Sequence, residues 1–328
     1  MRVKQTLEEI YTPIQRELGQ IDDAILGILA TDNPLSKQVI EYFFGVKGKT
    51  LRPALCLFGA GFAEDPEVTG NALPVAAALE IFHSATLIHD DIVDGSRLRR
   101  NRLTVNAKWG AQAAVLMGDY LHDRAMTAVF ETKNENLFSL LLKTACDVCD
   151  GEILEFSEKE NLSLTEAQYF RIIRKKTAAL FSACVEAGAL VAGLGSDDRF
   201  ALRQYGTDFG TAFQIVDDCL DFMGERDAFG KNPGSDCDAE VLTLPLIRAL
   251  SLASSNEQEE IRRTFQSGGK DKFDYLKKLI SGSGAIEYAM DRARDFSKRA
   301  VSHLAFLKDV PVRHSLEALS DFATERVK

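Results

Sequence analysis

Along most of the chain, apolar residues recur at intervals of three and four, the spacing that places them on one face of an α-helix. No stretch shows the sustained alternation of apolar and polar residues that is typical of a strand. The pattern therefore predicts an all-α protein. The stretches with the clearest helical spacing are 3–30, 74–94, 171–193, 210–224 and several shorter ones between 243 and 328.

Glycine, proline and short polar clusters predict where helices begin and end. Gly95 stands where the second of these helices should be capped, and Gly118-Asp119 and Gly151-Glu152 are expected to open two further helices. Residues 226–240 are rich in Gly, Asp, Asn and Pro and should form a loop. Within that loop, Gly230-Lys231 is a candidate flap over a phosphate, although the segment lacks the GxxxxGK[ST] pattern of a P-loop.

The size and composition of the chain indicate one large globular unit. Its 328 residues are 45% hydrophobic and include only eight prolines, so the chain can bury a sizeable core. No Pro- or Ser-rich linker divides it, and we expect residues 1–328 to form a single domain. The formal charge of 39 − 49 = −10 leaves no broad basic surface, which argues against a nucleic-acid partner.

The N-terminal segment and the cysteines predict a soluble, cytoplasmic protein. Residues 1–11 carry charges and no apolar core, unlike a signal peptide, and no uncharged apolar run approaches the roughly 18 residues of a transmembrane helix. Six scattered cysteines are typical of small buried side chains in a reducing compartment. Cys146 and Cys149 lie in a helical context without a second pair, so we expect them to pack in the core.

The motif DDxxD occurs twice, near the C-terminal ends of two predicted helices. Its residues are Asp90, Asp91, Asp94, Asp217, Asp218 and Asp221. On composition alone, two copies in one chain have a chance probability of about 0.002. Carboxylates one turn apart repel each other and oppose the negative end of the helix dipole, so a cation is expected beside them. Paired oxygen ligands without a Cys or His cluster suit Mg²⁺ bound to phosphate better than zinc.

Basic residues flank the acidic motifs. Lys49 and Arg52, three positions apart, share one helical face, an arrangement equally compatible with a solvated turn. Arg99 and Arg100 follow the first motif, where they either balance its charge or bind phosphate through the planar guanidinium group. Lys176 opens an alanine-rich helical stretch and could be either solvated or directed toward a ligand. The proximity of a metal site favours phosphate binding.

In their order and spacing, these segments resemble the trans-isoprenyl diphosphate synthases, the polyprenyl synthetase family. The resemblance covers roughly residues 40–250. Its motifs are Gly48-Lys49-x-x-Arg52-Pro53, Phe82-His83-x-Ala85-x-Leu87-Ile88-His89-Asp90-Asp91, Arg99-Arg100, Gly118-Asp119, Lys176-Thr177, Phe213-Gln214-x-x-Asp217-Asp218-x-x-Asp221, Gly230-Lys231 and Thr243-Leu244-Pro245. It implies a bundle of antiparallel helices around a deep central cavity, usually in a homodimer, and Mg²⁺-dependent transfer of a prenyl group.

The resemblance also implies a role for each site residue. The six aspartates would bind three Mg²⁺ ions that hold an allylic diphosphate, such as farnesyl or geranylgeranyl diphosphate. The other residues implied at that diphosphate are Arg99, Lys176 and Lys231. Those implied at the diphosphate of isopentenyl diphosphate are Lys49, Arg52, His83 and Arg100, although His83 is also compatible with a core histidine. Those facing the allylic cation are Lys176, Thr177 and Gln214.

Three positions depart from the family pattern. Asn101 and Leu103 replace the glycine and proline of RRGxP, which should alter the loop more than the chemistry. Glu155 replaces the glutamine of GExxQ and adds negative charge near the cavity. The Gly-Lys pair that usually precedes Thr-Leu-Pro is Glu240-Val241 here, which removes a lysine expected at the allylic diphosphate.

Other functions share parts of the pattern. A terpene cyclase or a squalene-type synthase also uses aspartate motifs, but has no need of Lys49, Arg52 and His83, which imply a second, non-allylic diphosphate. A non-catalytic subunit of a heteromeric synthase is a further alternative, although such a subunit should lose metal ligands first. All six aspartates are present.

The length of the product is predicted from the helix that leads to the first DDxxD motif. Ala85 lies about one turn before Asp90 and is too small to form the floor of a tunnel. We therefore expect a medium- or long-chain all-trans polyprenyl diphosphate, a product destined for membranes. A short-chain geranylgeranyl synthase remains an alternative, because Phe82 could narrow the tunnel one turn deeper.

Overall fold

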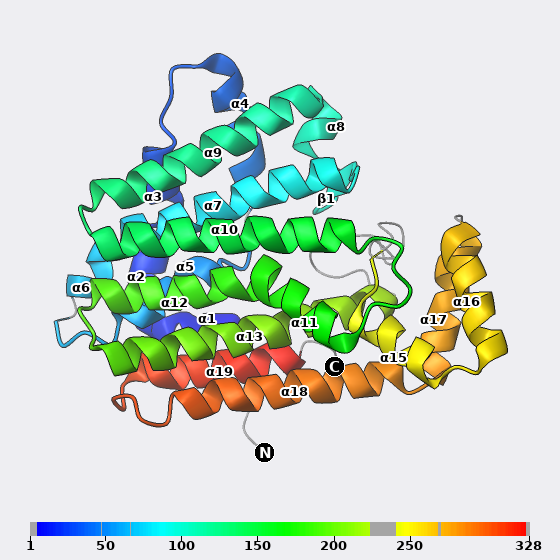
Figure 1. The fold of residues 1–328 in the computed structure, drawn as a ribbon. Coiled ribbons are helices and arrows are strands. Elements are labelled where there is room, and N and C mark those ends of the chain that lie inside the picture. The colour runs from blue at the N-terminus through cyan, green and yellow to red at the C-terminus, as the bar shows by residue number, and fades with distance from the viewer. Residues whose placement is uncertain (1–4, 47, 66, 224–240, 268–269, 326–328) are drawn as a thin grey trace.

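The computed structural model describes residues 5–46, 48–65, 67–223, 241–267 and 270–325, and these are almost entirely helical (Figure 1). The all-α prediction is confirmed. The α-helices are α1 Leu7–Tyr11, α2 Gln15–Leu18, α3 Ile21–Ile28, α4 Pro34–Phe44, α5 Leu51–Ala60, α6 Glu67–Asn71, α7 Leu73–Val93, α8 Val105–Trp109, α9 Ala111–Glu131, α10 Glu135–Ser157, α11 Glu166–Ile173, α12 Ala179–Val191, α13 Ser196–Met223, α15 Leu244–Leu252, α16 Ser255–Ser267, α17 Lys270–Gly282, α18 Ala285–His303 and α19 Pro311–Glu325.

Helix α7 lies at the centre of the larger hydrophobic core and ends at the first acidic motif. Its buried side chains surround the helix and include Ile81, Phe82 and Ile88, and an all-round apolar helix is stable only when neighbours cover it. Helices α3, α5 and α9 pack against it. By length and composition, residues Glu67–Val93 could cross a membrane, but 61% of the most apolar window is buried inside the molecule, as expected for a core helix.

Helix α13 links the larger core to a second hydrophobic cluster. Leu202, Tyr205 and Phe209 in its first half belong to the larger core, whereas Ile215 and Phe222 in its second half pack with α11, α15, α17 and α18. The hairpin of α16 and α17 projects from the end of the bundle (Figure 1). Because α13 runs through both clusters, its C-terminal half carries the second acidic motif to the point where they meet.

Two glycines that were expected to open helices lie inside them, so those predicted boundaries are wrong. Gly118 is within α9 and Gly151 is within α10. A Cβ atom at Gly118 would lie 2.2 Å from Nε2 of His89, and one at Gly151 would lie 2.3 Å from the backbone nitrogen of Lys176. Each glycine therefore serves the close approach of a neighbouring segment rather than a helix end.

The stretch predicted as one helix over 171–193 is divided. Helix α11 ends at Ile173, a π-helical turn, η2, spans Arg174–Ala178, and α12 begins at Ala179. A π-turn inserts an extra residue into the helical repeat and is common at functional sites. Here it contains Lys176 and Thr177.

The chain after the first acidic motif forms a small β-hairpin, which corrects the expectation that strands are absent. Strands β1 (Leu98–Arg99) and β2 (Arg102–Leu103) are antiparallel. The two residues between them, Arg100 and Asn101, have φ values of 51° and 59°. Such a turn requires positive φ at both positions and commonly contains Gly or Asn, which explains why asparagine is tolerated where the family pattern has glycine.

The cysteine pair of α10 is solvent-exposed, so the prediction that it packs in the core is wrong. Cys146 and Cys149 are both exposed, whereas Cys56, Cys184 and Cys219 are buried as expected. The pair lies on the outer face of α10, away from the bundle. Its neighbours at helical spacing on that face are apolar, which bears on how the chain associates with a second copy.

Candidate active site

The first acidic motif lies where α7 ends, and its members have different surroundings. Asp91 is 2% exposed and accepts hydrogen bonds of 3.0 and 3.1 Å from Nε of Arg99. Asp94 caps the helix before Gly95, whose φ of 61° turns the chain away. The hairpin thus engages the middle aspartate, while Asp94 lies 3.6 Å from Nζ of Lys159 and Asp90 interacts with Glu152.

Asp90 belongs to a cluster of three carboxylates around Lys176. The Nζ atom of Lys176 contacts Glu155 and lies 3.0 Å from Oε2 of Glu152. Glu152 in turn is hydrogen-bonded to Asp90. Burial raises the pKa of Asp90, and burial together with the charge of Asp90 raises the pKa of Glu152 to about 8. The cluster contains more carboxylate than one lysine can neutralise.

The second acidic motif is held by a chain of hydrogen bonds. Asp218 is buried and accepts bonds from the hydroxyl of Tyr169 at 2.6 Å and from Nε2 of Gln214 at 2.7 Å. Oε1 of Gln214 accepts a bond of 2.9 Å from the Thr177 hydroxyl. Burial raises the pKa of Asp218 to about 7 despite these donors. As in the first motif, the middle aspartate is engaged by protein groups.

The two motifs approach each other across Lys176 of η2 and Glu155 of α10. The negative charge of Glu155 contributes to the raised pKa of Asp218, and that of Asp90 contributes to the raised pKa of Lys176. Burial alone would lower the pKa of Lys176, so the surrounding carboxylates outweigh it. The structure therefore brings Asp90 and Asp218 of the two motifs close to a common set of residues, which are Glu155, Lys176, Thr177 and Gln214.

A second group of charges lies beside the first and is basic. The charges of Arg52, Arg99 and Arg100 add to burial in lowering the pKa of His83 well below its ordinary value, so its imidazole is neutral at pH 7. Glu80, one turn before His83 on α7, lies close enough to Arg52 and Arg100 for their charges to oppose the burial that raises its pKa. The guanidinium carbon of Arg52 lies 4.5 Å from the Phe181 ring centre.

The backbone around Lys49 is fixed by distant parts of the chain. The Tyr11 hydroxyl donates to the Lys49 carbonyl at 2.9 Å, and Nη1 of Arg100 donates to the Val46 carbonyl at 3.2 Å. A Cβ atom at Gly48 would lie 2.9 Å from Nη2 of Arg100. The glycine before Lys49 thus lets the hairpin arginine reach the loop that leads into α5.

The residues present suit a hard divalent cation that arrives with a ligand. Among the described residues, no three His, Cys, Asp or Glu side chains form a complete metal site. Carboxylate oxygens are the donors that Mg²⁺ prefers, and Mg²⁺ is often held by a few carboxylates together with substrate phosphates. Burial raises the pKa of Asp90 and of Asp218, and a bound cation would favour their ionised forms.

Comparison with a family model decides the relationship. The model of the polyprenyl synthetase family matches residues 33–281. The chain belongs to the polyprenyl synthetase family. Members of this family are prenyltransferases.

Similar proteins cover almost the whole chain. An all-trans-nonaprenyl-diphosphate synthase (geranyl-diphosphate specific) of Rhodobacter capsulatus is 34% identical over 98% of both chains. An octaprenyl diphosphate synthase of Escherichia coli is 31% identical over 98% of this chain and 99% of its own length. A crystal structure of polyprenyl synthase from Caulobacter crescentus CB15, complexed with calcium and isoprenyl diphosphate, superposes with a TM-score of 0.93 at 33% identity, with 99% of both chains covered.

Two polyprenyl synthetase positions singled out in the sequence lie outside the described residues. They are Lys231, with the loop 226–240 around it, and Glu240.

Sequence reasoning also missed two residues of the site. Glu80 lies three positions before His83 on a helix already predicted to face the site, so helical spacing could have found it. Tyr169 lies 49 positions from Asp218, and no local pattern connects them.

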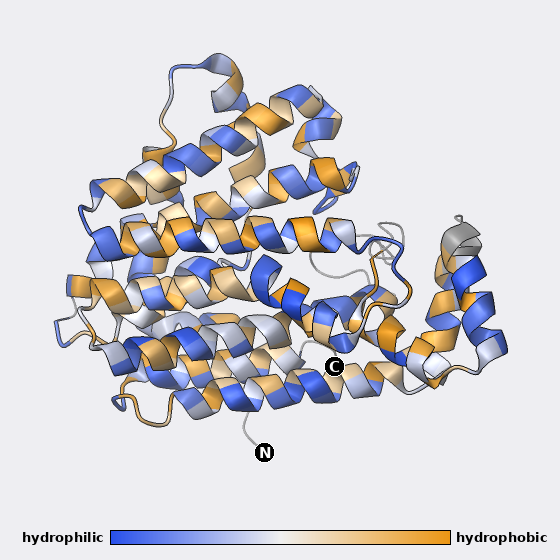
Figure 2. Cartoon of the chain, in the orientation of Figure 1, coloured by the Kyte–Doolittle hydropathy of each residue, from blue (hydrophilic) through white to orange (hydrophobic). Residues whose placement is uncertain are grey.

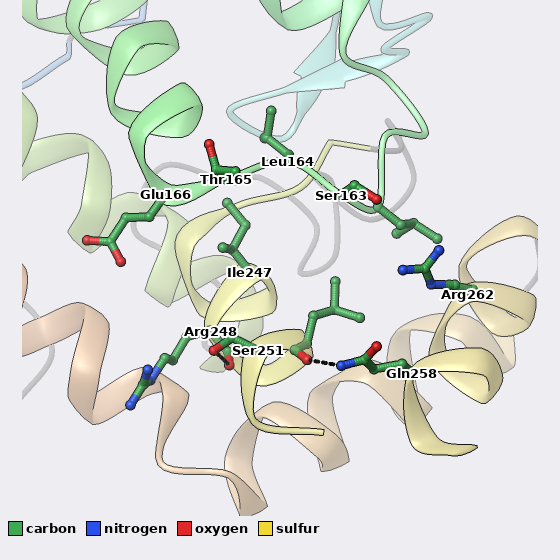
Figure 3. A pocket seen from close by; sticks show the side chains of 11 residues that line it. Ser163, Leu164, Thr165, Glu166, Ile247, Arg248, Ser251, Gln258 and Arg262 are labelled. Atoms are coloured by element: carbon green, nitrogen blue, oxygen red, sulfur yellow. Dashed lines mark hydrogen bonds between the residues drawn. The ribbon is translucent and has the colours of Figure 1, made fainter. Parts of the chain in front are cut away.

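A separate hollow of about 410 Å³ lies between residues 162–166 and helices α15 and α16 (Figure 3). It contains none of the predicted site residues of this synthetase. Arg248 points away from it and stacks on the Tyr288 ring, while Arg262 points toward Ser163. Glu166 is paired with Tyr288 and Arg292. Most of the charges at this hollow are thus already engaged, and we assign it no ligand.

Proposed function

We propose that this chain condenses isopentenyl diphosphate with an allylic diphosphate to give a medium- or long-chain all-trans polyprenyl diphosphate. The observation that carries the proposal is the pair of adjacent sites with opposite charge. One contains two acidic motifs around Lys176, which suits a diphosphate that arrives with metal ions. The other contains Arg52, Arg100 and neutral His83, which suits a diphosphate bound by the protein directly.

The outer aspartates are the proposed metal ligands. Asp90 and Asp94 would hold Mg²⁺ on one side and Asp217 and Asp221 on the other, while the middle aspartates Asp91 and Asp218 keep the two helix ends in place. Three ions fit the family resemblance. When bound, Mg²⁺ would neutralise the negative charge that develops on the leaving diphosphate.

The groups of the chain itself would then orient and protect the reacting carbons. Lys176 and Arg99 would bind phosphate oxygens, and Lys231 would join them from the segment outside the described residues. The Thr177 hydroxyl donates a hydrogen bond to Oε1 of Gln214, so the lone pairs of the hydroxyl oxygen are available to face the allylic cation. A hydroxyl and an amide stabilise positive charge by their dipoles and are poor nucleophiles, which leaves the double bond of isopentenyl diphosphate as the attacking group.

The second diphosphate would bind beside α5 and the hairpin. Lys49, Arg52 and Arg100 would supply positive charge, and His83 would donate a hydrogen bond as a neutral imidazole. The strained positive φ of Arg100 holds this side chain at the tip of the turn. Glu80 would hold Arg52 and Arg100 in place while no diphosphate is bound.

The product is proposed to grow along α7, away from Asp90. Ala85 presents no side chain that could block a chain at the first turn. Deeper in, the ring of Phe82 lies 5.8 Å from the ring of His122 on α9, and this pair would mark the first narrowing. The names of the two synthases from Rhodobacter capsulatus and Escherichia coli, nonaprenyl and octaprenyl, support a product longer than geranylgeranyl diphosphate.

The chain is proposed to act as a homodimer through α9 and α10. The exposed residues Leu142, Cys146, Cys149, Ile153 and Phe156 follow each other at spacings of four and three along α10, which is the pattern of a helix that packs against another helix. Apolar residues occur along the length of α10 (Figure 2). Val115, Leu116 and Phe130 of α9 are exposed as well. A second copy of the chain would cover this surface.

The cellular setting follows from the substrates. Isopentenyl diphosphate and a farnesyl or geranylgeranyl diphosphate primer carry charged diphosphate groups that favour water, so we propose that the enzyme works in the cytoplasm. The apolar product would leave toward a membrane, while the protein itself needs no span.

Replacing Asp90 with Ala tests this assignment. The variant should lose elongation of farnesyl diphosphate by labelled isopentenyl diphosphate, by at least about 10³-fold if the aspartate holds metal at the leaving group. The apo protein should melt no lower than wild type, because burial already disfavours the ionised carboxylate. Retained turnover in a folded variant would refute the role of Asp90.

A further inference from the structure

Helix α10 presents two pairs of carboxylates to two consecutive lysines. On its outer side, Lys175 lies 3.1 Å from both Asp147 and Asp150. On its inner side, Lys176 contacts both Glu152 and Glu155. In each pair the two acids are three positions apart, so they lie on one face of the helix. The outer arrangement is solvent-exposed, whereas the inner one faces the proposed diphosphate site.

Gly151 brings the inner lysine into this position. The lack of a Cβ atom lets the backbone of Lys176 pack directly against α10, where a side chain at residue 151 would collide with it. The π-helical turn places Lys176 there while Thr177 reaches Gln214. The motif Gly151-Glu152-x-x-Glu155 therefore holds Lys176 against α10.

We propose that Glu155 is a positioning residue that keeps Lys176 from binding diphosphate until metal ions are present. This inference rests on the proposed function. Without metal, Nζ of Lys176 is held by Glu155 and Glu152, so an incoming diphosphate must displace a carboxylate to reach it. Metal bound by the aspartates shifts this balance, and the diphosphate can then compete with Glu155 for the lysine.

The proposal explains the departure of this chain from the family pattern at residue 155. A glutamine at the same position would accept a hydrogen bond from Lys176 but carry no charge to be displaced. Glu155 therefore makes the binding of an allylic diphosphate depend more strictly on metal. It raises the KM for that substrate but takes no part in bond breaking.

The test compares Glu155→Gln with wild type and with a control, Asp147→Asn. The control removes one negative charge from the same helix at the outer lysine. Binding of inorganic diphosphate is measured by calorimetry in excess chelator and again with Mg²⁺. Removal of one nearby charge should tighten binding in chelator by about tenfold. Asp147→Asn should bind as wild type does.

Steady-state kinetics separate positioning from catalysis. Glu155→Gln should lower the KM for farnesyl diphosphate several-fold and change kcat by less than about twofold. Glu155→Asp, which keeps the charge, should retain the weak binding of wild type in chelator, and would thereby attribute the effect of Glu155→Gln to the lost charge. Melting temperatures of all variants confirm that each is folded.

Three outcomes would overturn the proposal. Unchanged binding of diphosphate in chelator would show that Glu155 does not restrain Lys176. A fall in both Mg²⁺ affinity and kcat in Glu155→Gln would make residue 155 a metal ligand instead. If Asp147→Asn tightened diphosphate binding as much as Glu155→Gln does, the effect would come from the net charge of the protein and not from the contact with Lys176. Absence of turnover by wild type would refute the proposed function, while the binding data would still decide the role of Glu155.

Discussion

At the scale of single residues, the two acidic motifs divide their work. Asp91 and Asp218 are buried and accept hydrogen bonds from Arg99, Tyr169 and Gln214, whereas the outer aspartates are the proposed metal ligands. A carboxylate that is hydrogen-bonded in the interior is expensive to move. The middle residue therefore fixes the helix end against which the others bind metal.

Replacing Tyr169 with Phe tests whether its hydrogen bond to Asp218 supports the metal site. Loss of the 2.6 Å bond leaves a buried carboxylate with one donor fewer, which should lower the free energy of unfolding by about 1–3 kcal/mol. The Mg²⁺ concentration needed for half-maximal turnover should rise several-fold. Tyr288→Phe removes a similar bond to Glu166, 2.7 Å long and outside the site, and should leave the Mg²⁺ requirement unchanged. Equal requirements in both variants would contradict the supporting role of Tyr169.

At the scale of elements, periodicity predicted the helices but not how closely they approach. The helix over 74–94 and the fold class could be read from three- and four-residue spacing, since that pattern is local. The positions of Gly118 and Gly151 could not, because their reason is a neighbour distant in sequence, His89 or Lys176. The same limit applies to the two-residue strands, which are too short to show alternation, and to Tyr169.

Helix α7 also supplies the test of product length. Ala85→Phe should shorten the product while nearly retaining the first condensation, because the new ring would close the proposed tunnel one turn from Asp90. Ala76→Phe is the matched control, because Ala76 is buried like Ala85 but lies nine positions earlier, on the opposite face of the same helix, and overpacking there should destabilise the fold by about 1–3 kcal/mol. Chromatography measures the length of the products, and thermal melting measures the stability of each variant. An unchanged product from a folded Ala85→Phe variant would show that the chain does not grow past Ala85.

At the scale of the whole molecule, the exposed apolar stripe of α10 predicts a dimer. Each apolar side chain buried in an interface contributes about 1.5–3 kcal/mol, so Ile153→Asp combined with Phe156→Asp should weaken self-association by at least about 100-fold. Phe306 is 94% exposed and lies outside α9 and α10, so Phe306→Asp should leave the dimer intact. Sedimentation velocity measures the oligomeric state of the double variant and of Phe306→Asp. A wild-type monomer at micromolar concentration would refute the prediction.

The most direct measurement is incubation of the purified chain alone with farnesyl diphosphate, labelled isopentenyl diphosphate and Mg²⁺, followed by sizing of the products. We expect label in all-trans diphosphates longer than geranylgeranyl diphosphate, and none when Mg²⁺ is chelated. A single addition that stops at geranylgeranyl diphosphate would make the chain a short-chain synthase. No turnover by the lone chain, with turnover restored by a second protein, would contradict the account and identify a subunit of a heteromeric synthase.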